Sequence, residues 1–166
     1  MPGIDKSEFI GTFRQMYEPV RNFVYYKTGD IELADDIAQD TFAKVWEMKN
    51  KIRIKTVKSL LFKIAGNLSK NQLEQKQVRF MFVNKYRQNS YAVSPEFELE
   101  LKEFDERLQR AIESLKDKDR IVFLMNRIDR LTYNQIADNL GLSVKAVEKR
   151  MKNALDDLKK MIEYKI

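Results

Sequence analysis

The sequence contains neither cysteine nor histidine among its 166 residues. Without cysteine, disulfide bonds, thiol switches and thiolate metal sites are excluded. Without histidine, the common zinc sites and the histidine-dependent catalytic triads are excluded as well. We therefore predict no metal site, no cofactor and no catalytic residue, and we expect that the protein is not an enzyme.

Glycine and proline are also scarce, with five and three residues, whereas 43% of the residues are apolar. This composition suits a helical globular protein, and the chain shows no clear strand pattern. No apolar run reaches membrane-spanning length, and the N-terminus lacks the apolar core of a signal peptide. We expect an all-α protein that works in the cytoplasm and does not insert into a membrane.

Charged residues make up 34% of the chain, and the net charge of +6 favours a polyanionic partner. This charge is sorted into blocks. Residues 30–47 carry six acidic residues against one lysine, whereas residues 51–90 carry ten basic residues against one glutamate. A uniformly solvated helical bundle rarely sorts charge in this way, so we expect distinct faces for distinct partners.

The spacing of apolar residues predicts several helices. They cover residues 7–27, 32–49, from 56 or 59 to 79 or 86, from about 96 to 115, and from 119 to about 129. Pro19 is expected to kink or split the first helix. Residues 89–95 are polar, contain a proline and lack a period, which makes them the best candidate for a linker.

Residues 131–155 have the pattern of a helix-turn-helix, a unit that presents its second helix to the major groove of DNA. Thr132 is placed to cap the first helix, Gly141 to end it, and Ser143 to cap the second. The outer face of the second helix is basic, and its apolar face is formed by Val144, Val147, Met151, Ala154 and Leu158. The alternative is an antiparallel helical hairpin with a solvated charged face.

Three segments together resemble one protein family, the bacterial extracytoplasmic-function (group IV) sigma factors of the sigma-70 family. Two of its conserved helices are similar to residues 35–46, DDIAQDTFAKVW, and to residues 59–71, SLLFKIAGNLSKN. Its fourth conserved region resembles residues 115–155. The order, the spacing and the total length all fit, and the resemblance covers nearly the whole chain.

The resemblance implies a protein that binds core RNA polymerase and directs it to specific promoters for transcription initiation. It implies two small helical domains joined by a flexible linker. Residues 1–88 would form the region-2 domain, which binds polymerase and recognises and melts the −10 element. Residues 89–96 would be the linker, and residues 97–166 would form the region-4 domain, whose helix-turn-helix recognises the −35 element.

The acidic helix resembles the polymerase-binding surface of the family, which meets the coiled-coil clamp helices of the largest polymerase subunit. Carboxylates and an amide on one helix face can pair with arginines and lysines of a partner helix. The resemblance assigns this role to Asp35, Asp36, Gln39, Asp40 and Phe42. The alternative is a solvated acidic face over a core of Ile37, Phe42 and Trp46.

Promoter DNA is assigned to two other surfaces. A basic groove attracts phosphates by releasing counterions, and the loop 49–57 would capture a flipped base of the −10 element. The −10 residues are Lys51, Arg53, Lys55, Lys63, Asn67, Lys70 and Asn71. The −35 residues are Ser143, Lys145, Glu148, Lys149, Arg150, Lys152 and Asn153. Base specificity is expected from Glu148, Lys149 and Lys152, because such side chains reach base edges in the major groove.

Two other classes of function fit part of the sequence. A conventional regulator would bind duplex DNA as a dimer through the same helix-turn-helix, but it leaves residues 35–46 and 60–71 unexplained. An enzyme acting on DNA is disfavoured, because the chain has no glycine-rich phosphate loop and no carboxylate cluster at metal spacing. The resemblance further implies an anti-sigma factor as a partner, beside core RNA polymerase and promoter DNA.

Overall fold

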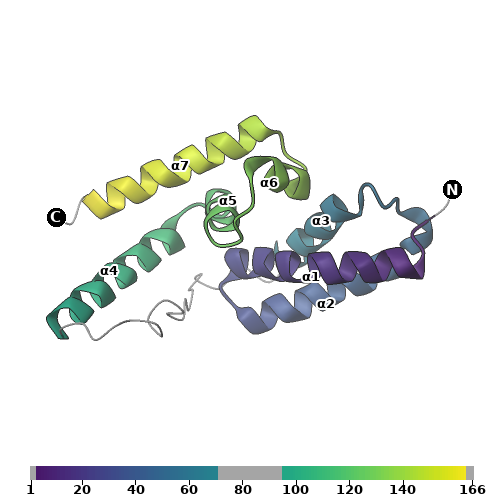
Figure 1. Ribbon diagram of the computed structural model, residues 1–166, viewed down its shortest axis with the longest axis horizontal. Helices are drawn as coiled ribbons and strands as arrows, with labels where there is room; N and C mark the ends of the chain where they lie inside the picture. The colour runs from purple at the N-terminus through teal and green to yellow at the C-terminus, as the bar shows by residue number, and fades with distance from the viewer. Residues whose placement is uncertain (1–2, 71–94, 164–166) are drawn as a thin grey trace.

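The computed structural model describes residues 3–70 and 95–163. Within these ranges the chain forms seven α-helices, one short 3-10 helix and no strand, so the all-α prediction is confirmed (Figure 1). The elements are α1 (Lys6–Thr28), α2 (Ile31–Glu47), η1 (Lys49–Lys51), α3 (Val57–Lys70), α4 (Pro95–Ser114), α5 (Asp117–Arg127), α6 (Tyr133–Leu140) and α7 (Val144–Glu163).

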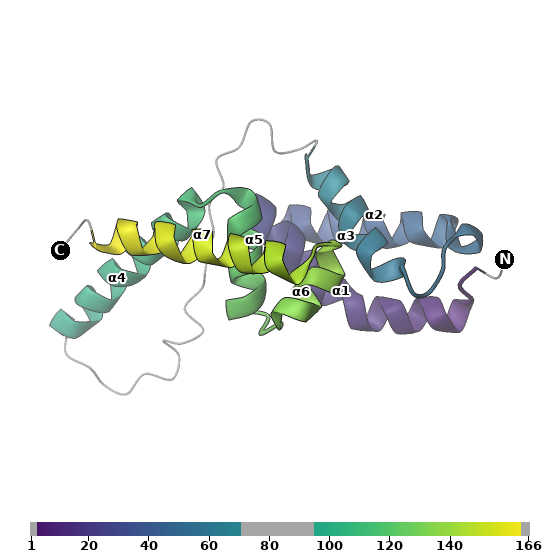
Figure 2. The ribbon, with the colours of Figure 1, turned by 90° about the horizontal axis from the view of Figure 1, so that it is seen from above.

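The first three helices form an N-terminal unit, residues 3–70. Asp5 caps α1 in a capping box with Glu8, and Gly29, with φ 72°, ends the helix in the left-handed conformation. Asp30 follows directly and caps α2 through the backbone N–H of Leu33. This short turn lays α1 and α2 side by side in opposite directions, with α3 packed against both (Figure 2).

Pro19 lies inside α1, and the helix continues through it to Thr28, so the predicted split did not occur. Proline removes one backbone hydrogen bond from the helix interior. The residues that follow it are deeply buried, with Val20 and Val24 at 0% exposure. Tertiary packing against α2 and α3 therefore holds the helix together across this position.

The last four helices form a C-terminal unit, residues 95–163. In it α7 packs against α4, α5 and α6, and α5 also contacts α6. Pro95 occupies the first position of α4, where the missing N–H of proline would have no helical partner in any case. Pro95 and Glu96, which the sequence placed in the linker, therefore belong to this helix. The rest of the expected linker and Asn71 lie outside the described residues.

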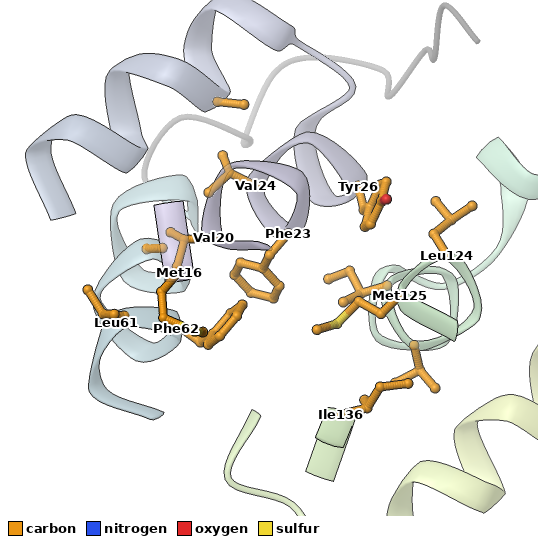
Figure 3. Close-up of a cluster of buried hydrophobic side chains, with 14 of the residues drawn as sticks. Met16, Val20, Phe23, Val24, Tyr26, Leu61, Phe62, Leu124, Met125 and Ile136 are labelled. Carbon is orange, nitrogen blue, oxygen red and sulfur yellow. The ribbon is translucent and has the colours of Figure 1, made fainter. Parts of the chain in front are cut away.

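The two units share one hydrophobic cluster. Figure 3 shows Phe23 of α1 beside Phe62 of α3 on one side and Met125 of α5 on the other, with Ile136 of α6 close by. All four side chains are at most 7% exposed. The helices that meet across this contact are α1 with α5 and α3 with α6.

Candidate functional site

Three polar side chains of α2 form an exposed surface of their own. Asp36, Gln39 and Asp40 are exposed, and their spacing of three and four residues places them on one face of the helix. Asp30 and Glu32 stand at the N-terminal end of the same helix, where carboxylates oppose the positive end of its dipole. The result is a rigid, negatively charged helix face that is open to a partner.

Asp35 belongs to the same predicted set but is held by α1. One of its carboxylate oxygens lies 2.7 Å from Nε of Arg21, and the Tyr17 hydroxyl donates to it at 3.5 Å. The carboxylate is about half-exposed, and its charge is already balanced within the protein. Asp35 therefore orients α2 on α1 and presents less free charge than Asp36 and Asp40 do.

Phe42 does not lie on this surface, which corrects its predicted place in the interface. It is 3% exposed and packs between α1 and α2, with its ring centroid 5.0 Å from that of Phe13 and 6.3 Å from that of Phe9. An aromatic ring on the inner side of an amphipathic helix is drawn into the core by its apolar area. Phe42 supports α2 from beneath, whereas Phe13, at 39% exposure, reaches the surface.

The basic loop after α2 is anchored at both ends. The backbone N–H of Ile4 donates to the carbonyl of Lys49 at 2.9 Å. Further along, Ile52 and Val57 are buried, and both the N–H and the hydroxyl of Thr56 donate to the carbonyl of Arg53. The three cations of the loop that were assigned to DNA are exposed on this fixed frame; they are Lys51, Arg53 and Lys55.

Helix α3 adds a second part of the basic surface. Lys63, Asn67 and Lys70 are exposed and follow one another at helical spacing. On the buried side of the helix, Phe62 is 3% exposed and meets the ring of Phe23 edge-on at 5.3 Å.

The helix-turn-helix forms as the sequence predicts. Thr132 and Gln135 make a capping box at the start of α6, and Gly141 ends that helix with φ 65°. The Ser143 hydroxyl accepts from the N–H of Ala146 at 3.1 Å and so caps α7. The predicted apolar face is buried at Val147, Met151, Ala154 and Leu158. Val144 is 36% exposed, because it stands at the first position of α7, beyond the packed part of the face.

Most of the side chains assigned to the −35 element lie on the outer face of α7. The exposed ones are Ser143, Lys145, Glu148, Lys149, Lys152 and Asn153. Arg150 differs from them, since it is half-buried and lines a cleft between the two units. A duplex lying on the outer face of α7 would therefore meet a row of lysines, with Glu148 among them.

The cleft between the units has a volume of about 1400 Å³ and is lined by both apolar and basic side chains. Its apolar residues include Phe23, Leu60, Ile121, Leu140 and Leu142. Among the described residues that line it, the cations are Lys27, Lys51, Arg53, Lys63, Lys70, Lys118 and Arg150, and the one carboxylate is that of Asp117. The structure thus brings four residues assigned to the −10 element together with one residue assigned to the −35 element.

Sequence reasoning missed a buried arginine between the units. Arg120 is 1% exposed, and its Nε donates to the carbonyl of Tyr26 in α1 at 2.9 Å. Its other nitrogens donate to Leu115 and Asp117 in its own unit. The available signal was helical spacing, because Arg120 stands four residues before the buried Leu124 and so shares its helix face.

A second polar contact joins the same helices. One oxygen of Asp129 accepts from the Tyr26 hydroxyl at 2.5 Å and from the Asn22 amide at 3.1 Å. Its other oxygen is buried without a hydrogen-bond partner among the described residues. Burial raises the pKa of Asp129, although both hydrogen bonds act against the rise. The pKa of Tyr26 is also raised, first by burial and then by its bond to Asp129.

Within the parts of the chain that the structure describes, no helix has the length and apolarity needed to cross a membrane. Among the same residues, no group of three or more acidic side chains is arranged to hold a metal ion.

Comparison with known proteins relates both units to one family. Residues 12–79 match the family model described as Sigma-70 region 2, and residues 105–158 match the one described as Sigma-70, region 4. The chain is 32% identical over 128 residues to the ferric citrate uptake sigma factor FecI of Escherichia coli. The aligned segment covers 74% of this chain and 72% of FecI. It is 28% identical over 153 residues to the RNA polymerase sigma factor YlaC of Bacillus subtilis, covering 89% and 88% of the two chains.

Two solved structures share the fold. CnrH in complex with the cytosolic domain of CnrY matches with a TM-score of 0.62 at 22% identity, over 98% of this chain and 92% of that one. The sigma factor RpoE in complex with the anti-sigma factor NepR from Bartonella quintana matches with a TM-score of 0.59 at 18% identity, over 95% and 98% of the chains.

Proposed function

This chain belongs to the extracytoplasmic-function group of the sigma-70 family, and from that membership we propose how its surfaces divide the work of a sigma factor. A protein of this family binds core RNA polymerase and directs it to promoters for transcription initiation. The sigma factors of this family are regulatory proteins. We propose that this protein is likewise not an enzyme and needs no cofactor.

We assign residues 1–88 to the polymerase-binding and −10 domain, residues 89–96 to the linker, and residues 97–166 to the −35 domain. The two matched ranges, 12–79 and 105–158, support this division because each falls inside one proposed domain. The start of α4 at Pro95 argues for a linker that ends slightly earlier.

The polymerase-binding surface is proposed to be the exposed face of α2. The observation that carries this assignment is the alignment of Asp36, Gln39 and Asp40 on one exposed helix face within the region-2 match. Such a face complements a basic helix, since charge-assisted hydrogen bonds form without rearrangement of the backbone. Asp35 and Phe42 act in this proposal by fixing α2 on α1.

Promoter DNA is proposed to bind at two basic surfaces. The −10 surface consists of the anchored loop with Lys51, Arg53 and Lys55, and of α3 with Lys63, Asn67 and Lys70; Asn71, outside the described residues, completes the set. The −35 surface is the outer face of α7. Exposed lysines supply phosphate contacts and the salt-dependent part of the affinity, whereas Glu148 is placed to accept from a cytosine amino group.

We further propose that the protein acts in the cytoplasm, because bacterial RNA polymerase transcribes there. An anti-sigma factor is a proposed partner as well. The support comes from the structural relative RpoE, which was solved together with the anti-sigma factor NepR.

Co-elution with bacterial core RNA polymerase on size-exclusion chromatography tests the proposed function. The full-length protein should form a stoichiometric complex, and Asp36→Arg with Asp40→Arg should abolish it because the reversed charges repel a basic partner helix. The control is Glu103→Arg with Glu106→Arg, which makes the same change of charge on exposed positions of α4. A protein that ignores polymerase and binds duplex DNA as a dimer would instead be a conventional regulator.

A further inference from the structure

A short segment ahead of α1 contacts the loop that carries part of the proposed −10 surface. The segment is Gly3–Asp5, and the loop is residues 48–56, between α2 and α3. Because α1 and α2 run in opposite directions, the start of α1 lies beside the end of α2, where this loop begins (Figure 1). None of the proposed contacts with polymerase or DNA uses the segment, so its packing on the loop asks for another role.

Ile4 joins the segment to the loop through both its side chain and its backbone. The side chain is 4% exposed and belongs to the hydrophobic core. The backbone N–H donates to the carbonyl of Lys49 at 2.9 Å, and Lys49 begins the short 3-10 helix η1. A three-residue helix satisfies few of its own backbone groups, so a bond from outside fixes where η1 lies.

Gly3 lets the segment lie directly on the backbone of η1. A Cβ added at this position would lie 2.1 Å from the carbonyl oxygen of Lys49 and 2.5 Å from Cα of Asn50. Both are backbone atoms, which cannot swing aside as the end of a flexible side chain can. Glycine is therefore required here for space, and a larger residue would push the segment and the loop apart.

The side chain of Lys49 holds the same end of the loop against α2. Its ammonium lies 3.6 Å from the centroid of the Trp46 ring, a cation–π contact. The Trp46 ring packs in turn on Phe9 of α1, with the ring centroids 4.9 Å apart. The carbonyl and the ammonium of Lys49 are thus both engaged, and the loop leaves α2 in one fixed direction.

Beyond η1 the loop presents its side chains to the outside. Ile52 is 5% exposed and anchors the backbone, whereas the next three residues, Arg53, Ile54 and Lys55, are exposed. A loop that receives a base from an opened duplex loses less conformational freedom on binding when its backbone is already fixed. The contacts of Gly3 and Ile4 supply such fixation at the first end of the loop.

We propose that Gly3 and Ile4 are positioning residues for recognition of the −10 element, which hold η1 and the loop in the conformation that receives the flipped base. This inference rests on the proposed function for the role of the loop. The contact between the segment and the loop is a property of the described residues, and it is tested separately below.

Gly3→Ala tests the proposal with the smallest change, because one methyl group must displace either the segment or the loop. Gly11→Ala is the matched control, since it adds the same methyl group to an exposed glycine of α1 with nothing within 4 Å of the new Cβ. Ile4→Ala removes the buried side chain and should loosen the loop in the same direction. Ile4→Val keeps most of that side chain and should largely restore the wild-type behaviour.

The position of the loop is read from Trp46, the one tryptophan of the chain. In Gly3→Ala and Ile4→Ala the Lys49 ammonium should leave the indole ring, so the emission should shift and acrylamide should quench it more strongly. Hydrogen exchange of the amides of residues 49–55 should accelerate by about tenfold, the change expected from loss of one hydrogen bond. Gly11→Ala should alter neither signal.

Base preference separates positioning from a general loss of structure. The complex of each variant with core polymerase selects from single-stranded DNA with random central positions, and the bound strands are sequenced. Gly3→Ala should lower the enrichment of the preferred base by about tenfold relative to the wild type and to Gly11→Ala. Affinity for an oligo-dT strand should stay within about twofold, because Lys51, Arg53 and Lys55 still contact phosphates.

Each result decides one step of the proposal. Unchanged Trp46 emission and amide exchange in Gly3→Ala would refute the positioning of the loop. A displaced loop with full base enrichment would refute its role in recognition, and equal losses of enrichment and oligo-dT affinity would reduce the segment to a support of the fold. Failure of the proposed function would appear separately, as a wild-type protein that does not co-elute with core polymerase.

Discussion

A guanidinium group that is 1% exposed is costly to bury unless its N–H groups find acceptors. Arg120 has acceptors from both units, namely the carbonyls of Tyr26, Lys27, Glu113 and Leu115 and the carboxylate of Asp117. A lysine ammonium is a single point charge with three donors, so it could not donate hydrogen bonds to all of these acceptors at once. At this position a single side chain ties the end of α1 to the start of α5.

Asp129 makes the contact between the units sensitive to acid. Because burial raises its pKa while the units are in contact, this closed state binds more protons than an open state with separated units between the usual aspartate pKa of about 4 and the raised value. The contribution of Asp129 to closure is therefore fully present at low pH and is lost as the pH rises through the raised pKa. The groups that face it are Tyr26, Asn22 and Glu18, all on α1.

Energy transfer between fluorophores on two introduced cysteines, Gln15→Cys in α1 and Asn134→Cys in α6, should accordingly rise as the pH falls through the raised pKa of Asp129 toward the usual aspartate range. Asp129→Asn should flatten this dependence, since asparagine does not titrate. A variant Asp129→Asn that keeps the full pH response would assign that response to a different group.

At the scale of the element, α3 carries a glycine that its structure does not require. An added Cβ at Gly66 would lie 3.8 Å from the Phe23 ring, which is ordinary van der Waals contact. The Lys27 ammonium donates to the backbone carbonyl of Gly66 at 3.0 Å, and alanine would keep that acceptor. Gly66→Ala should therefore raise the free energy of unfolding by roughly 0.5–1 kcal/mol, because glycine loses more conformational freedom in a helix than alanine does.

Urea denaturation followed by circular dichroism measures this change, and Gly141→Ala is its matched control. Gly141 has φ 65° at the end of α6, where alanine is strained although the space around it is open. The same chemical change should there lower stability by about 1 kcal/mol. A loss of stability in both variants would mean that the backbone of α3 departs from an ordinary helix at Gly66.

The elements themselves were largely predictable, because their signals are local. Thr132, Gly141 and Ser143 each act within a few residues of their own position, and all three were assigned correctly as caps or as the turn. Most of the apolar face assigned to the second helix is likewise buried, at Val147, Met151, Ala154 and Leu158. The family resemblance assigned Phe42 to the polymerase interface, whereas the structure buries it, as the alternative of a core with Ile37 and Trp46 predicts. Val144 was assigned to the buried face although it is 36% exposed, because pattern alone does not say where the packed part of an amphipathic face ends.

At the scale of the whole molecule, the contact between the units could not be predicted. Its bonds join α1 to residues about a hundred positions later, such as Tyr26 to Asp129 and Arg120 to Tyr26. No periodicity encodes such a pairing, and a chain read as two independent domains gives no reason to look for it. The assignment of exposed residues to contacts with polymerase and DNA follows from the family resemblance, and these roles are proposals.

The whole molecule also determines how a weakened −35 surface should behave. Lys149→Ala with Lys152→Ala removes two exposed cations from α7, so promoter affinity of the complex with polymerase should fall, and the slope of log affinity against log salt should become shallower by about two. Co-elution with core polymerase should be unchanged. Lys102→Ala with Lys116→Ala, two exposed lysines elsewhere in the same unit, is the control for loss of charge.

Salt titrations of promoter binding, by fluorescence anisotropy with labelled duplex, separate the outcomes. Equal losses in both double variants would mean that α7 contributes only general charge. A loss confined to Lys149 and Lys152 but independent of salt would assign them to base edges rather than phosphates. In the complex the −10 surface holds the same DNA, so the −35 contact forms at a high effective concentration and its loss is partly masked. The double variant should therefore lose more affinity on a duplex that carries the −35 element alone than on a complete promoter.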